Sequence, residues 1–183
     1  MRIFFLLFFF LSQNFANASV VSQIISNFNS TQSMKFNFVQ TIDGKIEKGK
    51  CTLVYPKKIF CEYIDFYNKI LVSNGKSLLI NSDKNNQYFR YPLEKTPLNL
   101  ILDKDFLINK IKNLSGRIVN DKFINYTFIE NQNEINIFFN KDNYNLIGWQ
   151  TLDIYQNLSI TYIDIIFTNQ KLKKNLFKLP NQD

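Results

Sequence analysis

Short stretches of alternating apolar and polar residues run through most of this chain, and they constrain its fold more than any other feature. Near the start, Met34, Phe36, Phe38 and Ile42 alternate with lysine, asparagine and threonine. A period of two is typical of a β-strand with one buried and one solvated face. Because the successive stretches are joined by short turns, the pattern favours hairpins and an antiparallel sheet.

About 10–11 strands of this kind are predicted. Asn74-Gly75 is the strongest turn signal, because both residues accept a positive φ, and Pro56 marks a second hairpin turn. The predicted strands cover residues 34–42, 49–54, 58–64, 69–73, 76–81, 87–91, 117–119, 123–130, 134–140, 146–154 and 158–168.

Two segments depart from the strand pattern. Apolar residues recur at helical spacing over residues 20–28, which predicts one amphipathic helix before the sheet. A second helical segment begins at Thr96-Pro97, a capping residue followed by one suited to a first helical position. It continues to Ile111 with a break near Asp103. The sequence therefore predicts an α+β fold, with a single curved antiparallel sheet covered on one side by helices.

Residues 1–18 have the organisation of a cleaved signal peptide. Arg2 precedes an unbroken apolar run over residues 3–11, and Ala16-Asn17-Ala18 offers small residues at a cleavage site. The run is too short to span a bilayer, which needs about 20 residues. We expect export and cleavage after Ala18, which leaves residues 19–183 as one domain. Since Ser19 is not cysteine, we expect no lipid anchor on that domain.

The composition excludes most catalytic chemistry. The chain has no histidine, which removes histidine-based triads and most zinc sites. Its five glycines are too few for a phosphate-binding loop, and the acidic residues stand singly. We therefore expect no catalytic residues, no metal site and no cofactor. The net charge of +7 is spread thinly, which argues against nucleic acid. It fits a soluble surface or weak attraction to an anionic membrane or acidic partner.

Both cysteines lie on the hairpin predicted around Pro56. With the turn centred there, Cys51 and Cys61 face each other with Cβ atoms about 4.5–5.5 Å apart, close to disulfide reach. An oxidising compartment favours a structural bridge, and two free buried thiols are the alternative. Metal binding lacks further soft ligands, and a redox role lacks the Cys-x-x-Cys spacing.

The aromatic content leaves two interpretations open. Outside the predicted signal peptide, 13 of the 19 phenylalanines remain. These rings either pack the sheet against the helices or line a cavity between a half-closed barrel and its helical cover. Composition does not decide between a full interior and a cavity.

Several segments together resemble a known family. They are MKFNFVQTI, GKCTLVYPKKIFCEY, ILVSNGKSLLIN, TPLNLIL, LIGWQTLD and LFKLP. In order and spacing, and over nearly the whole of residues 19–183, they are similar to the periplasmic carrier of outer-membrane lipoproteins (LolA). The resemblance implies an incomplete β-barrel with a helical lid over an apolar cavity, and no enzymatic activity.

The resemblance also implies a function. It is that of a soluble periplasmic carrier that binds the acyl chains of lipoproteins and shuttles them from the inner to the outer membrane. The implied partners are acylated lipoproteins, an inner-membrane lipoprotein-releasing ABC transporter and, if present, an outer-membrane receptor lipoprotein. We expect a monomer. Exposing one chain of about sixteen carbons costs on the order of 12 kcal/mol, at roughly 0.8 kcal/mol per methylene, so a carrier must offer comparable apolar surface.

Strand alternation and the family pattern together predict the site. The expected acyl-binding wall is Phe36, Phe38, Leu53, Ile59 and Leu79. The expected lid and gate positions are Tyr55, Pro56, Leu98 and Ile101. The family usually has arginine before the turn proline, where it tethers the lid by hydrogen bonds. Tyr55 can donate one hydrogen bond but cannot form arginine's charged fork, so either the opening mechanism differs or the cargo is another amphiphile.

Other functions remain open at this stage. A divergent periplasmic lipid-binding or lipoprotein-sensing module would share the fold, although the sensing relatives carry an additional C-terminal domain that we do not expect here. The outer-membrane receptor of the same pathway is anchored through an N-terminal cysteine, where this chain has Ser19. A small exported hydrolase would need paired carboxylates. A structural β-domain would have a full interior.

Overall fold

The computed structural model describes residues 19–64, 69–82 and 87–179, and within them eleven strands form one sheet. The accompanying helices are α1 (Val20–Ser30), the 3-10 helix η1 (Leu93–Lys95), α2 (Leu98–Ile101) and α3 (Lys104–Lys112). The strands are β1 (Ser33–Ile42), β2 (Lys45–Val54), β3 (Lys58–Tyr63), β4 (Ile70–Asn74), β5 (Ser77–Ser82), β6 (Gln87–Pro92), β7 (Arg117–Val119), β8 (Phe123–Glu130), β9 (Asn133–Asn140), β10 (Leu146–Leu152) and β11 (Leu158–Thr168). The predicted signal peptide, residues 1–18, lies outside the described residues.

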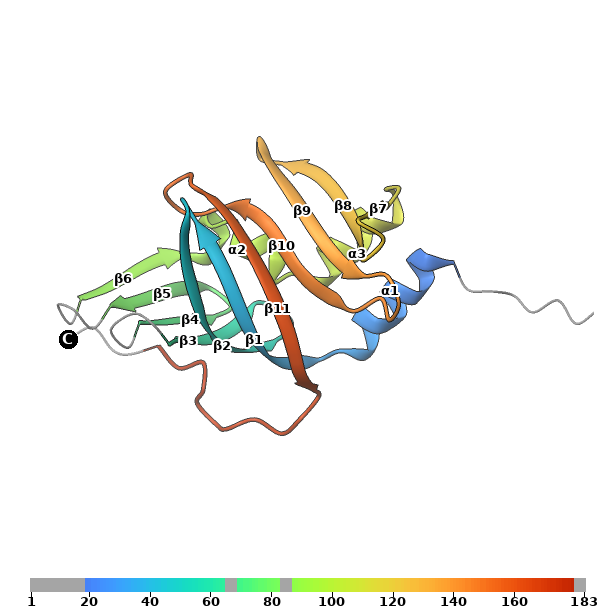
Figure 1. Cartoon of the computed structure of the whole chain (residues 1–183). Coiled ribbons are helices and arrows are strands. Elements are labelled where there is room, and N and C mark those ends of the chain that lie inside the picture. The colour runs from blue at the N-terminus through green and yellow to red at the C-terminus, as the bar shows by residue number, and fades with distance from the viewer. Residues whose placement is uncertain (1–18, 65–68, 83–86, 180–183) are drawn as a thin grey trace, which may run out of the picture.

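The sheet is antiparallel throughout, with the order β6-β5-β4-β3-β2-β1-β11-β10-β9-β8-β7. It consists of two runs of hairpins, which meet where β1 pairs with β11. Within the described residues, the edge strands β6 and β7 do not pair with each other, so the sheet curves without closing (Figure 1). This confirms the predicted α+β fold, an incomplete barrel made of one antiparallel sheet.

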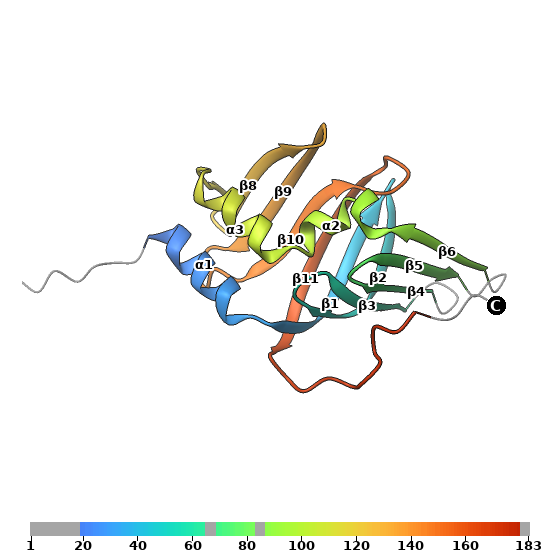
Figure 2. The same cartoon turned by 180° about the vertical axis from the view of Figure 1, so that it is seen from behind.

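The helical segment crosses from one edge of the sheet to the other. It follows β6 and precedes β7, which lie at opposite edges, so η1, α2 and α3 pass over the face of the sheet (Figure 2). The segment has the break predicted near Asp103. This residue is the N-cap of α3, and its side chain accepts a hydrogen bond from the Phe106 N–H at 3.1 Å.

The β1–β2 hairpin is longer than predicted. Asp43 and Gly44 both have positive φ, 48° and 73°, which is the turn geometry that suits a tight hairpin. Pairing therefore begins at Ile42 and Lys45, and β2 starts four residues before the predicted position 49. The Asp43-Gly44 pair in the sequence was the signal for this longer hairpin. Further along β2, the Phe38 ring lies against Gly49, where a Cβ atom would collide with it.

The helices and one half of the sheet form a packed core. Ile24 and Phe28 of α1 are buried, and the Phe28 ring meets the edge of Phe139 at 5.5 Å between centroids. Leu107 and Ile111 of α3 are fully buried in the same cluster. Since α1 and α3 fill this half, the space left under the lid lies over the other half. No helix in the described part of the chain is long and apolar enough to cross a membrane.

Candidate functional site

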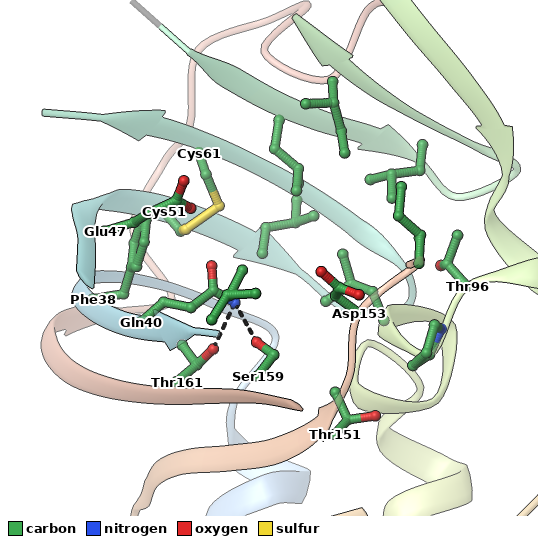
Figure 3. A pocket seen from close by; sticks show the side chains of 18 of the residues that line it. Phe38, Gln40, Glu47, Cys51, Cys61, Thr96, Thr151, Asp153, Ser159 and Thr161 are labelled. Carbon is green, nitrogen blue, oxygen red and sulfur yellow. Dashed lines mark hydrogen bonds between the residues drawn. A yellow bond between two sulfur atoms is a disulfide. The ribbon is translucent and has the colours of Figure 1, made fainter. Parts of the chain in front are cut away.

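A cavity of about 530 Å³ lies between the concave face of the sheet and the start of the lid. This volume falls within the range of roughly 300–1,000 Å³ typical of ligand sites. Its apolar lining, part of which appears in Figure 3, includes Phe36, Phe38, Ile59, Leu71, Leu78 and Ile80. Phe89 and Tyr155 also line it and are 45% and 67% exposed, so the cavity opens to solvent on their side.

The predicted wall residues divide between the cavity and other positions. Phe36, Phe38 and Ile59 line it. Leu53 shares the concave face with them but packs in the core opposite Ile59, outside the lining. Leu79 is fully buried and does not line the cavity. Its neighbours Leu78 and Ile80 do, and successive residues of a strand point to opposite faces. Leu53 and Leu79, which were expected in the acyl-binding wall, therefore lie outside the cavity lining.

The lid positions are also divided. Leu98, at the start of α2, lines the cavity together with Thr96 and Pro97. Ile101 is buried in the core and is not part of the lining. Among the described residues, the start of the helical insertion therefore covers the cavity, whereas the apolar side chains that follow, such as Ile101, Leu107 and Ile111, pack in the core.

Cys51 and Cys61 are joined by a disulfide in the cavity wall (Figure 3). They are directly opposite each other in the β2–β3 register, with Cα atoms 4.1 Å apart. The turn around Pro56 sets this register, because Val54 pairs with Lys58 immediately beside it. The bridge therefore links two neighbouring strands where they face the cavity.

Tyr55 does not tether the lid through its hydroxyl group. The side chain is buried, and its Oη has no hydrogen-bond partner in the described part of the chain. Burial raises the pKa of this phenol above its usual value. Its ring packs edge-on against Phe28, and the Lys104 Nζ lies 5.6 Å from the ring centroid. Tyr55 therefore acts as a packing residue between the turn and the helices. Pro56 is exposed at the turn.

Lys57 instead connects the β2–β3 turn to the lid. Its N–H donates to the Leu102 carbonyl oxygen at 3.0 Å, and its Nζ lies 3.1 Å from the Asp103 carboxylate. Both partners lie at the junction of α2 and α3. We call this pair of contacts the Lys57–Asp103 tether. Sequence reasoning missed it, although Asp103 before an apolar helical run and Lys57 after the turn proline were visible signals.

A group of neutral polar residues lies on one side of the cavity. The Gln40 Nε2 donates to the Ser159 Oγ at 2.8 Å and to the Thr161 Oγ1 at 3.0 Å (Figure 3). Thr151 is directly opposite Ser159 on the neighbouring strand, and its Oγ1 is buried without a partner among the described residues. We call Gln40, Thr151, Ser159 and Thr161 the polar strip. Sequence reasoning missed it because its members come from β1, β10 and β11.

An ion pair also contributes to the cavity lining. The Lys69 Nζ is 2.8 Å from the Glu47 carboxylate and 4.2 Å from the centroid of the Tyr63 ring. Burial raises the Tyr63 pKa, and the Glu47 charge raises it further. No group of three or more His, Cys, Asp or Glu side chains in the described residues could hold a metal ion. The cavity thus offers a large apolar wall with a small polar side, which suits an amphiphile.

Comparisons with known proteins concern the family and the fold of the chain. A family model described as "Outer membrane lipoprotein carrier protein LolA" matches residues 29–180. No curated protein matches the chain. An uncharacterized conserved protein from Thermus thermophilus is structurally similar, with a TM-score of 0.53, 9% identity and coverage of 90% of this chain and 93% of that one. The LolA superfamily protein NE2245 from Nitrosomonas europaea has a TM-score of 0.45 and 8% identity, with coverage of 88% of this chain and 99% of that one. At such identity, the likeness to the Thermus protein shows the fold alone.

Proposed function

This chain belongs to the LolA family of outer membrane lipoprotein carrier proteins, and from that premise we propose that it carries lipoproteins by enclosing their acyl chains. The observation that carries the proposal is the apolar cavity of about 530 Å³ under the helical lid. The family is one of carriers rather than enzymes, and we propose a binding role without catalysis here.

The physical requirement is apolar surface that water cannot reach. Exposing one chain of about sixteen carbons costs on the order of 12 kcal/mol. The phenylalanine and aliphatic side chains of the wall offer burial without specific polar contacts. Such a wall accepts cargo proteins that differ in everything except the acyl anchor.

The lid closes this surface between loading and release. The Lys57–Asp103 tether joins the β2–β3 turn to the α2–α3 junction, so it holds the first turn of α2 over the cavity. We propose that opening the cavity breaks this tether. It stands in for the arginine that the family usually has before the turn proline.

The proposed carrier acts in the periplasm. It receives acylated lipoproteins from an inner-membrane lipoprotein-releasing ABC transporter and delivers them to the outer membrane, to a receptor lipoprotein where one exists. A divergent lipid-binding or lipoprotein-sensing module of the same fold would hold the same acyl chains but would not deliver them.

The test is a solubility assay. A fluorescent diacylated lipopeptide in detergent is diluted into buffer with the purified protein, aggregates are removed by centrifugation, and the soluble fluorescence is measured. Acceptor vesicles are then added, because a carrier releases the lipopeptide to them and a sensing module retains it. If the wild-type protein keeps none of the lipopeptide soluble, the carrier proposal is wrong.

Matched substitutions locate the binding surface in the same assay. Ile59→Glu places a carboxylate in the wall, and Phe89→Glu places one at the exposed rim, where it does not threaten the fold. Ile129→Glu is the control, because Ile129 is 71% exposed and lies outside the cavity lining. We expect both cavity variants to lose most of the solubilised lipopeptide and the control to retain it. Thermal unfolding checks that Ile59→Glu is folded, since a buried charge can cost several kcal/mol.

A further inference from the structure

We propose that the polar strip recognises the ester carbonyl groups that join acyl chains to glycerol. The inference rests on the proposed function and deepens it, because it assigns the chemistry at the head of the bound chains. Four neutral polar side chains on three adjacent strands line the cavity: Gln40, Thr151, Ser159 and Thr161. The strand register brings them together, since Gln40 pairs with Thr161 and Thr151 pairs with Ser159.

The strip presents hydrogen-bond donors that have no acceptor. The Ser159 and Thr161 oxygens each accept from the Gln40 amide, so each hydroxyl hydrogen is left over. Neither hydroxyl, nor that of Thr151, donates to an acceptor in the part of the chain that the structure describes. Thr151 is only 6% exposed and its Oγ1 is buried, so a ligand acceptor reaches this hydroxyl when the wall side chains beside it shift on binding. A buried hydroxyl without a partner is destabilising, and a ligand acceptor would relieve this.

The charges around the strip select a neutral acceptor over an anion. Among the described residues that line the cavity, the charged ones are Glu47, Lys69 and Asp153. Lys69 is paired with Glu47 at 2.8 Å, and Asp153 leaves the lining with a net negative charge. A free fatty-acid carboxylate is therefore disfavoured. An ester carbonyl is an uncharged acceptor that needs donors only, which is what the three hydroxyl groups supply.

The position of the strip fits the head of an acyl chain. It lies beside the apolar wall, since Thr161 is opposite Trp149, which also lines the cavity. A chain whose carbonyl is held at the strip can extend along Phe36 and Ile59. Diacylglyceryl groups of lipoproteins and of phospholipids share this ester chemistry, so the probes must separate the two sources.

The experiment compares ester and ether lipids. The probes are a dipalmitoylglyceryl-cysteine lipopeptide, its dihexadecyl ether analogue without carbonyl groups, and phosphatidylethanolamine with palmitoyl chains. Their dissociation constants are measured on the full-length protein by displacement of a fluorescent acyl probe. We expect the wild type to bind the ester lipopeptide about 2- to 10-fold more tightly than the ether, the effect of one net hydrogen bond.

Two threonine substitutions assign the preference to the strip. Thr151→Val removes the hydroxyl while keeping the shape, and should bring the ester affinity down toward that of the ether. It should not lower the melting temperature, because no existing hydrogen bond is lost. Thr52→Val is the control: Thr52 is also a buried strand threonine but does not line the cavity. Its ester preference should match that of the wild type.

The outcomes separate this inference from the proposed function. Equal binding of ester and ether lipopeptides by the wild type overturns the role of the strip and leaves the carrier proposal standing. Failure to bind either lipopeptide overturns the carrier proposal itself. An ester preference that survives Thr151→Val in a folded protein refutes the assignment to this strip. Phosphatidylethanolamine binding that Thr151→Val weakens as much as it weakens binding of the ester lipopeptide supports the strip and extends it to diacylglyceryl esters in general.

Discussion

Loss of the Cys51–Cys61 disulfide should destabilise the protein by an amount that follows from its position in the chain. The bridge closes a loop with a sequence separation of 10 residues. In the chain-entropy model, a loop of this size contributes about 3 kcal/mol by restricting the unfolded state. Replacing both cysteines by alanine removes that restriction. Both side chains are buried in the core cluster and also line the cavity, so the packing lost with two sulfur atoms adds to this figure.

The expected change is large enough to measure by thermal unfolding. For a domain of about 150–250 residues, 1 kcal/mol shifts the melting temperature by about 2–4 °C, so the double alanine variant should melt about 6–12 °C lower. Adding a reducing agent should lower the wild-type melting temperature by a similar amount and leave the variant unchanged. This control separates the cross-link from the loss of two sulfur atoms.

Two results would contradict the reasoning. A double variant that melts within about 1 °C of the oxidised wild type would show that the loop-closure model fails here. Labelling of either cysteine by an alkylating agent, in protein unfolded without reduction, would show that the bridge is absent. The same lipopeptide assay should show that the variant still binds acyl chains below its melting temperature, since the hairpin is also held by its backbone ladder.

Three further predictions concern the lid and the buried tyrosines. Tyr55→Phe should leave the free energy of unfolding unchanged or raise it by up to about 1–3 kcal/mol, because the buried Oη has no partner among the described residues. A clearly lower free energy of unfolding in urea would show that the hydroxyl does form a hydrogen bond. Burial raises the pKa values of Tyr55 and Tyr63 in the folded state. Their contribution to stability is therefore complete below pH about 10 and falls as the pH rises further. Replacing both by phenylalanine should flatten the alkaline limb of a stability–pH curve, and an unchanged limb would refute this. Asp103→Asn keeps a residue suited to capping α3 but breaks the ion pair with Lys57, so it should lower the free energy of unfolding by less than about 1 kcal/mol and speed lipopeptide release. Asp103→Ala also removes the cap and should lower the free energy of unfolding by about 1 kcal/mol more. Equal release rates in the wild type and Asp103→Asn would show that the tether does not gate the cavity.

The sequence determined those parts of the protein that depend on near neighbours. Alternation over residues 34–42 predicted the strand that became β1, and Asn74-Gly75 predicted the β4–β5 turn. The position of Pro56 placed Cys51 opposite Cys61, because the register of a hairpin follows from its turn. The ordered motifs indicated the family, which the match over residues 29–180 confirms. Local backbone preferences are strong enough to fix such features without knowledge of the rest of the fold.

Tertiary structure alone decided which side chains meet. Leu78, Leu79 and Ile80 are all apolar, so alternation could not say which of them faces the cavity; the pairing of β5 with its neighbours settled it in favour of Leu78 and Ile80. The Lys57–Asp103 tether and the polar strip join residues that are distant in sequence. Because a strand's own pattern carries no information about its partner strands or about the helix laid across them, such contacts exist only once the whole sheet has assembled.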